Sequence, residues 1–266
     1  MTNPFSKKNR LGLVCKLAVL SLTLLALTSA FADAFVVTAE KPGVQVPPVG
    51  LSYESFNNQT PHTTLNGSTF ITNFGLNQYS GTYSGTIVWF PADQYGGAGG
   101  TGVYPEVFTG QSYTLQIAPQ GNAPAANYFG MWFSALDQGN LLQFYKGNNL
   151  VYSFTPAAFI QIVGGCPNAG NAYCGNPTAD FKGGESREQF AYLNFWDSNG
   201  SFDKVVFSKT TKCGGCGFES DNHVVAYLTN GPGGLPISTT PEPGTLLLLG
   251  SGLTGMAAIL RRKLVS

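Results

Sequence analysis

Short runs of alternating apolar and polar residues, separated by turn residues, constrain the fold of this 266-residue chain more than any other feature. In residues 112–118 the alternation places Tyr113, Leu115 and Ile117 on one face of a strand. Further strands are expected in the runs 35–49 (a lead-in with one edge strand), 51–56, 69–74, 82–90, 128–136, 141–145, 150–154, 190–196, 202–208 and 218–228. One short helix is expected from Thr155-Pro156 to residue 162, because proline favours the first helical position. The sequence therefore predicts an all-β fold, an antiparallel β-sandwich compatible with a jelly-roll topology.

Turn residues between neighbouring runs also predict which strands pair. Asp137-Gln-Gly-Asn140 and Lys146-Gly-Asn-Asn149 separate the three runs within residues 128–154, which predicts a three-stranded meander. Asp197-Ser-Asn-Gly200 in the same way predicts a hairpin between the run before it and the run after it.

Both ends of the chain carry an apolar segment with basic residues beside it. Residues 1–32 combine a positive n-region, an apolar core and the small-x-small site Ala30-Phe31-Ala32, which is typical of a secretory signal. Residues 246–260 predict a C-terminal transmembrane helix of roughly 22 Å, shorter than the ~30 Å hydrocarbon core of a bilayer. Arg261-Arg262-Lys263 follow this segment, and the positive-inside rule then places the body of the protein outside the cytoplasm.

The order of Pro241-Glu242-Pro243, an apolar run and a terminal basic cluster resembles the PEP-CTERM sorting signal of bacterial exosortase substrates. The resemblance implies that Pro-Glu-Pro is the recognition site and that the helix holds the precursor transiently in the inner membrane. It implies the secretion machinery and exosortase as partners, and a location at the cell surface or in the extracellular matrix. The expected domains are a signal peptide (1–32), a β-sandwich domain (35–230), a linker (231–240) and the sorting signal (241–266).

A second resemblance lies within the body. Residues 128–137 and 140–145 are similar to a strand block found in PEP-CTERM surface proteins, and three later runs look like the closing strands of those proteins. These residues belong to strand cores and turns. The similarity therefore supports fold and family, and it implies no catalytic residue.

The charge of the body disfavours nucleic acid as a partner. The two terminal segments hold seven of the fourteen Lys and Arg residues but only two of the Asp and Glu residues, Asp33 and Glu242. The body therefore carries seven cationic against twelve anionic side chains. Phosphate binding requires clustered cations, which this balance does not provide.

The body contains four cysteines: Cys166, Cys174, Cys213 and Cys216. Local pairing is expected, Cys166 with Cys174 and Cys213 with Cys216, because each bond would hold a glycine-rich loop. The two short-spaced pairs could instead converge in a four-thiolate zinc site. Export to an oxidising compartment favours the disulfides.

Two groups of polar residues are candidate oxygen clusters. Glu219 and Asp221 are two apart, so on a strand they face the same side. Such a pair could bind Ca²⁺ or serve as acid and base in a glycosidase, although turn or structural use is more common. Asp137 with Asn140 is the second candidate, for which an Asx-type turn is the simpler interpretation. No other cofactor is expected.

Aromatic residues provide the remaining candidates. Most lie within strand runs, where packing in the core is the usual role. Tyr95 and Tyr104 flank a glycine-rich loop and are better placed to contact a glycan. His62 and His223 belong to no recognisable nucleophile motif.

These features predict an exported, non-enzymatic surface or matrix protein, structural or glycan-binding, associated with extracellular polysaccharide. The alternative is a secreted carbohydrate-active hydrolase. A concave cleft in which two carboxylates converge from different strands would favour the enzyme.

Overall fold

The computed structural model describes residues 35–48, 50–75, 78–210 and 216–237. The expected signal peptide, the apolar helix 246–260 and Pro241-Glu242-Pro243 lie outside these residues. Within the part that is described, no helix is long and apolar enough to cross a membrane.

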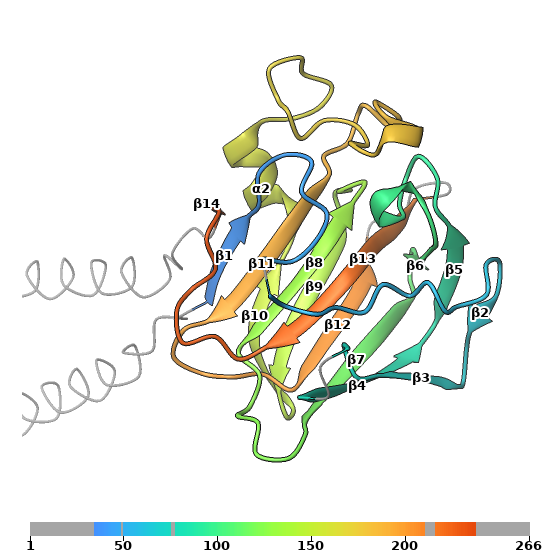
Figure 1. The fold of residues 1–266 in the computed structure, drawn as a ribbon. Coiled ribbons are helices and arrows are strands. Elements are labelled where there is room, and N and C mark those ends of the chain that lie inside the picture. Colours follow the sequence, from blue (N-terminus) through green and yellow to red (C-terminus); the bar gives the residue numbers. More distant parts are fainter. Residues whose placement is uncertain (1–34, 49, 76–77, 211–215, 238–266) are drawn as a thin grey trace, which may run out of the picture. The chain divides into compact units, whose positions relative to one another are not determined.

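The described chain forms two antiparallel sheets (Figure 1). The eight-stranded sheet has the order β14 (Leu235–Pro236), β1 (Phe35–Ala39), β11 (Ala191–Asp197), β8 (Tyr128–Ser134), β13 (Gly217–Ala226), β6 (Val103–Phe108), β5 (Ile87–Pro91), β2 (Thr64–Leu65). The six-stranded sheet has the order β10 (Asn149–Phe154), β9 (Asn140–Lys146), β12 (Lys204–Lys209), β7 (Ser112–Pro119), β4 (Tyr79–Gly85), β3 (Thr69–Thr72). The helices are the 3₁₀ turns η1 (Ala98–Gly100) and η2 (Ala179–Phe181) and the α-helix α2 (Pro156–Val163).

An aromatic core joins the inner faces of the two sheets. Phe207 of β12 stacks on Tyr113 of β7 with ring centroids 4.3 Å apart, and it contacts Phe218 of the opposite sheet at 5.7 Å. Phe144 of β9 likewise meets Phe195 of β11 at 5.2 Å. Fully burying one such side chain contributes ~1.5–3 kcal/mol. The alternation of apolar residues seen in the sequence thus corresponds to the inward faces of the strands.

The eight-stranded sheet is also covered on its outer face, which explains why β8 and β13 are buried along their whole length. The segment between β1 and β2 crosses this face over β13 (Figure 1). Glu54 exchanges two backbone hydrogen bonds with His223, at 2.8 and 3.0 Å. The run 51–56 therefore contributes a single bridge residue instead of the predicted strand. The apolar cluster under this segment consists of Tyr128, Trp132, Ala135, Phe190, Tyr192, Val224 and Ala226.

Two predictions about strand pairing and one about the extent of a strand are wrong. β8 pairs with β11 and β13, whereas β9 pairs with β10 and β12 in the other sheet, so the expected meander is only a β9–β10 hairpin. β11 and β12 also lie in different sheets and form no hairpin. The run 82–90 is divided between β4 and β5, which belong to opposite sheets. Turn residues permit a tight reversal and a crossing between sheets equally, so they do not identify the partner strand.

The β-domain extends past residue 230. β14 pairs with β1, the Thr38 hydroxyl donates a hydrogen bond to the Gly233 carbonyl at 2.6 Å, and Ile237 is buried. The first seven residues of the expected linker are therefore attached to the fold.

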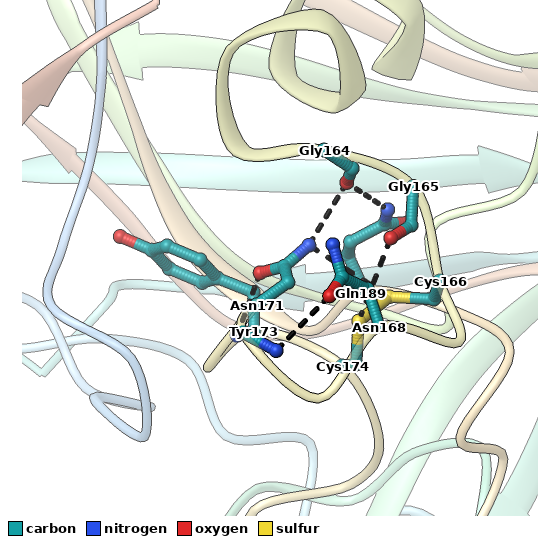
Figure 2. Close-up of a disulfide and its surroundings, with 9 residues drawn as sticks. Gly164, Gly165, Cys166, Asn168, Asn171, Tyr173, Cys174 and Gln189 are labelled. Carbon is teal, nitrogen blue, oxygen red and sulfur yellow. Dashed lines mark hydrogen bonds between the residues drawn. A yellow bond between two sulfur atoms is a disulfide. The ribbon is translucent and has the colours of Figure 1, made fainter.

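The segment after α2 is held by a disulfide and by polar contacts (Figure 2). Cys166 and Cys174 are bonded, as local pairing predicted. The side-chain amides of Asn171 and Gln189 both donate to the Gly164 carbonyl at 2.8 Å, where the helix has ended. A cystine sulfur is not a thiolate ligand, so the alternative of a four-thiolate zinc site is wrong. Cys216 is also disulfide-bonded, and Cys213 lies outside the described residues.

Candidate carboxylate pocket

A cavity of about 370 Å³ lies where β5, β6 and β13 meet loops from three other parts of the chain. Its lining combines six carboxyl side chains with four aromatic rings. We call this cavity the carboxylate pocket. The lining residues are Phe90, Asp93, Tyr95, Tyr104, Glu106, Phe108, Asp137, Glu185, Glu188, Cys216, Gly217 and Glu219.

Two glutamates from neighbouring strands form the floor of the carboxylate pocket. Glu106 of β6 and Glu219 of β13 are directly opposed in register, and their carboxyl groups are hydrogen-bonded to each other. Their neighbours Val107 and Phe218 belong to the apolar core, so strand alternation directs both glutamates to the other face. Gly217 leaves the room that this pair needs, because a Cβ there would lie 1.9 Å from Glu106 Oε1.

Burial determines the protonation of this pair. It raises the pKa of Glu106 to about 7, and it raises the pKa of Glu219 well above its usual range, with the charge of Glu106 as the next contribution. A carboxyl–carboxyl hydrogen bond requires a proton on one partner, so the two groups share one at neutral pH. Glu219 Oε2 is buried and has no hydrogen-bond donor among the described residues. The floor therefore presents an acceptor that a bound hydroxyl or amine could satisfy.

One wall carries both tyrosines that the sequence singled out. The Tyr104 hydroxyl donates to Asp93 Oδ1 at 3.1 Å, and burial raises the pKa of Tyr104 far above its usual range. The backbone N–H of Tyr95 donates to the same carboxylate oxygen at 2.8 Å. Tyr104 is buried as part of the wall, whereas Tyr95 is 40% exposed at the rim. Asp93 thus fixes the two aromatic residues around one cavity.

Asp137, which lines the cavity, is one member of the second predicted oxygen cluster. Lys209 Nζ donates to Asp137 Oδ2 and to Asn140 Oδ1, the latter at 3.0 Å. The Lys209 ammonium group thus lies between the two side chains that the sequence selected. Burial raises the pKa of Glu188 to about 8, assisted by its hydrogen bond to Asp137. In the described part of the chain, no group of three or more His, Cys, Asp and Glu side chains is arranged to hold a metal ion.

Asp221 does not belong to the carboxylate pocket. Its Oδ2 accepts a hydrogen bond from the Ala98 N–H at 2.8 Å, and its Oδ1 accepts one from the Asn222 N–H at 2.7 Å. Burial raises the pKa of Asp221 to about 8. Asp221 therefore anchors η1 to β13, and it does not line the cavity together with Glu219. The carboxyl group that joins Glu219 comes from Glu106.

Sequence reasoning missed Glu106, Glu188, Asp93 and Lys209. For Glu106 and Lys209 the sequence contained a signal that could have identified them. Glu106 is the only charged residue in the otherwise apolar strand Val103–Phe108. Lys209 continues the buried alternation of Val205 and Phe207, so its inward direction could have been read from spacing. Asp93 and Glu188 lie in loops whose position only the tertiary structure determines.

Comparisons with known proteins identify the C-terminal segment alone. The model of the PEP-CTERM protein-sorting motif matches residues 239–263. No curated protein and no solved structure matches the chain. The chain thus carries a PEP-CTERM protein-sorting motif, which directs exosortase-dependent sorting to the cell surface.

Proposed function

We propose that this protein is a non-enzymatic glycan-binding protein of the bacterial surface and its polysaccharide matrix, and that the carboxylate pocket is its binding site. The observation that carries the proposal is the placement of an unpaired buried acceptor, Glu219 Oε2, in a cavity lined with aromatic rings. Aromatic faces bind the C–H faces of sugars, and carboxyl oxygens accept hydrogen bonds from their hydroxyls.

The size of the carboxylate pocket suits a short piece of a glycan. Small-molecule sites have volumes of roughly 300–1,000 Å³, so a cavity of about 370 Å³ is near the lower limit. Tyr95 at the rim is placed to stack on the part of the ligand that leaves the cavity. We therefore expect recognition of a chain end or of a single sugar side branch.

Charge restricts the class of glycan. Six carboxyl side chains line the cavity, and the cationic group beside them, Lys209 Nζ, is engaged by Asp137 and Asn140. A glycan that carries carboxylate, sulfate or phosphate would meet like charge in a poorly solvated site. The preferred ligands are therefore neutral glycans or glycans that bear free amino groups.

A glycan array probed with the exported protein tests the proposal. We expect binding to neutral or amino-bearing glycans and weak binding to acidic ones. The Tyr95→Ala and Glu219→Gln variants should each reduce affinity about tenfold, the effect of losing one contact worth ~1.4 kcal/mol. Tyr227→Ala is a matched control, because Tyr227 is similarly exposed and does not line the cavity. Unchanged binding in both pocket variants would exclude this cavity as the site.

The hydrolase remains the second candidate, because two carboxyl groups from β6 and β13 do converge in a concave cavity. Glu106 and Glu219 are hydrogen-bonded directly to each other, so their carboxyl groups lie closer together than the ~5 Å or more that separates the two carboxyl groups of a glycosidase. A catalytic pair would therefore need Glu188, from the loop before β11, as its second member. Release of reducing sugar from a bound glycan, abolished by Glu188→Gln, would favour the enzyme. Stable binding without release would favour the non-enzymatic proposal.

A further inference from the structure

We propose that Lys209 and Asn140 form an intramolecular isopeptide bond, which joins Nζ of the lysine to Cγ of the asparagine and covalently links β12 to β9. This proposal is independent of the ligand of the carboxylate pocket, and concerns how the domain is stabilised outside the cell.

The two side chains are already placed together by the sheet. Lys209 and Asn140 are directly opposed in the register of β12 and β9, and Nζ lies 3.0 Å from Oδ1. Strand alternation with Phe207 and Leu142 directs both side chains into the space between the sheets. Lys209 is 1% exposed and Asn140 is 0% exposed. Water is thus kept away from an amine and a carboxamide that are held in contact.

Asp137 supplies the proton transfer that the reaction needs. Lysine is nucleophilic only as the neutral amine, and Asp137 Oδ2 is hydrogen-bonded to Nζ, where it can accept a proton. Glu188 is hydrogen-bonded to Asp137 on the other side. The raised pKa of Glu188, about 8, keeps this second carboxyl group largely protonated at neutral pH, so it donates to Asp137.

The step balances without an oxidant or a cofactor. The Lys209 ammonium gives one proton to Asp137, and the neutral Nζ attacks Cγ of Asn140. The tetrahedral intermediate collapses with cleavage of the Cγ–Nδ2 bond. The leaving nitrogen takes up the proton held by Asp137 and the second proton lost from Nζ. The products are one secondary amide and one ammonium ion.

Two unfavourable features of the unreacted site disappear in the product. Asn140 Nδ2 is buried and has no hydrogen-bond partner among the described residues, and a buried ammonium group is costly to desolvate. The reaction removes this nitrogen and converts the ammonium group into a neutral amide. Asp137 lines the carboxylate pocket, which gives the released ammonium ion a path to solvent.

Mass spectrometry of the reduced, exported protein tests the proposal. The intact mass should fall short of the mass expected for the processed chain by one ammonia. Protease digestion should yield a branched peptide that joins the segment containing Asn140 to the segment containing Lys209. A full intact mass would overturn the proposal. So would an ammonia loss without a branched peptide, because a succinimide at an asparagine produces the same mass.

Variants identify the participants. Asp137→Ala keeps both reacting side chains, and the protein should then retain the full mass and yield two separate linear peptides. Lys209→Arg should do the same, whereas Lys204→Arg, on the same strand, should keep the branched peptide. A branched peptide that joins Lys209 to Asp137, with loss of water, would overturn the choice of Asn140. The wild-type mass decides the matter even if a variant fails to fold.

Discussion

His223 Nε2 lies 2.9 Å from Ser220 Oγ, and His223 Nδ1 lies 2.9 Å from the Tyr83 hydroxyl. A serine and a histidine at this distance could suggest a nucleophile with its base. Both residues are fully buried, however, and the imidazole stacks on Phe207 with ring centroids 5.1 Å apart. The pair is therefore a polar connection within the core, and it links β13 to β4 of the opposite sheet.

Burial makes the stability of the domain sensitive to acid through His223. The pKa of His223 is lowered to about 3, from an ordinary value of about 6.5 in the unfolded chain. Below pH 6.5 the unfolded chain therefore binds a proton that the folded protein does not. The free energy of unfolding is therefore independent of His223 titration above pH 6.5. It decreases as pH falls from 6.5 toward 3, by ~1.4 kcal/mol per pH unit.

The His223→Gln variant tests this coupling. Denaturant unfolding between pH 7 and pH 4 should show that the variant loses less stability on acidification than the wild type. At pH 7 it should be the less stable protein, because it disrupts the hydrogen bonds with Ser220 and Tyr83. His62→Gln is the control, because it makes the same substitution at an exposed histidine. Identical slopes for His223→Gln and the wild type would contradict the prediction.

Glu106 should act in the opposite direction. Its pKa is raised from 4.5 to about 7 in the folded protein, so its contribution to stability is complete below pH 4.5 and is lost as pH rises through 7. Glu106→Gln should therefore match the wild type near pH 4 and be more stable than it at pH 9, by about 3 kcal/mol. Thermal unfolding at the two pH values measures this difference. Asp180→Asn, a change at an exposed carboxylate, is the control.

Gly217 tests the geometry of the pocket floor. An added Cβ would lie 1.9 Å from Glu106 Oε1, so Gly217→Ala must displace that carboxyl group from Glu219. We expect a loss of about 1–3 kcal/mol in unfolding free energy, typical of overpacking, together with weaker glycan binding. Gly165→Ala is the matched control, because nothing lies within 4 Å of a Cβ there. Equal stability of the two variants would show that Glu106 can move at little cost.

Most strand positions could be predicted from the sequence, because the alternation of apolar residues is a local property. The runs at 112–118 and 150–154 became β7 and β10 almost unchanged, and the expected helix is α2. Strand partners could not be predicted. Whether the chain reverses or crosses to the other sheet after Leu136 depends on which apolar face is already covered, and this is a property of the whole fold.

The candidate site was predictable to a similar degree. Tyr95, Tyr104, Asp137 and Glu219 were selected from sequence, and all four line one cavity. Their separate selection gave no indication of a shared site, because β6 and β13 lie far apart in the chain. The partner of Glu219 could be found only from the register that opposes it to Glu106.

The sorting signal leads to a prediction that does not depend on the pocket. The PEP-CTERM motif covers residues 239–263, and its Pro-Glu-Pro triplet is the expected recognition site of exosortase. Replacing Pro241, Glu242 and Pro243 by alanine should leave export intact and prevent processing, so that the precursor stays in the membrane fraction. Cell fractionation followed by immunoblotting for the β-domain measures this. A matched triple alanine replacement at Leu264-Val265-Ser266, which lies outside the matched motif, should still be processed. Surface delivery of the Pro-Glu-Pro variant at the wild-type level would show that this triplet is not the recognition site.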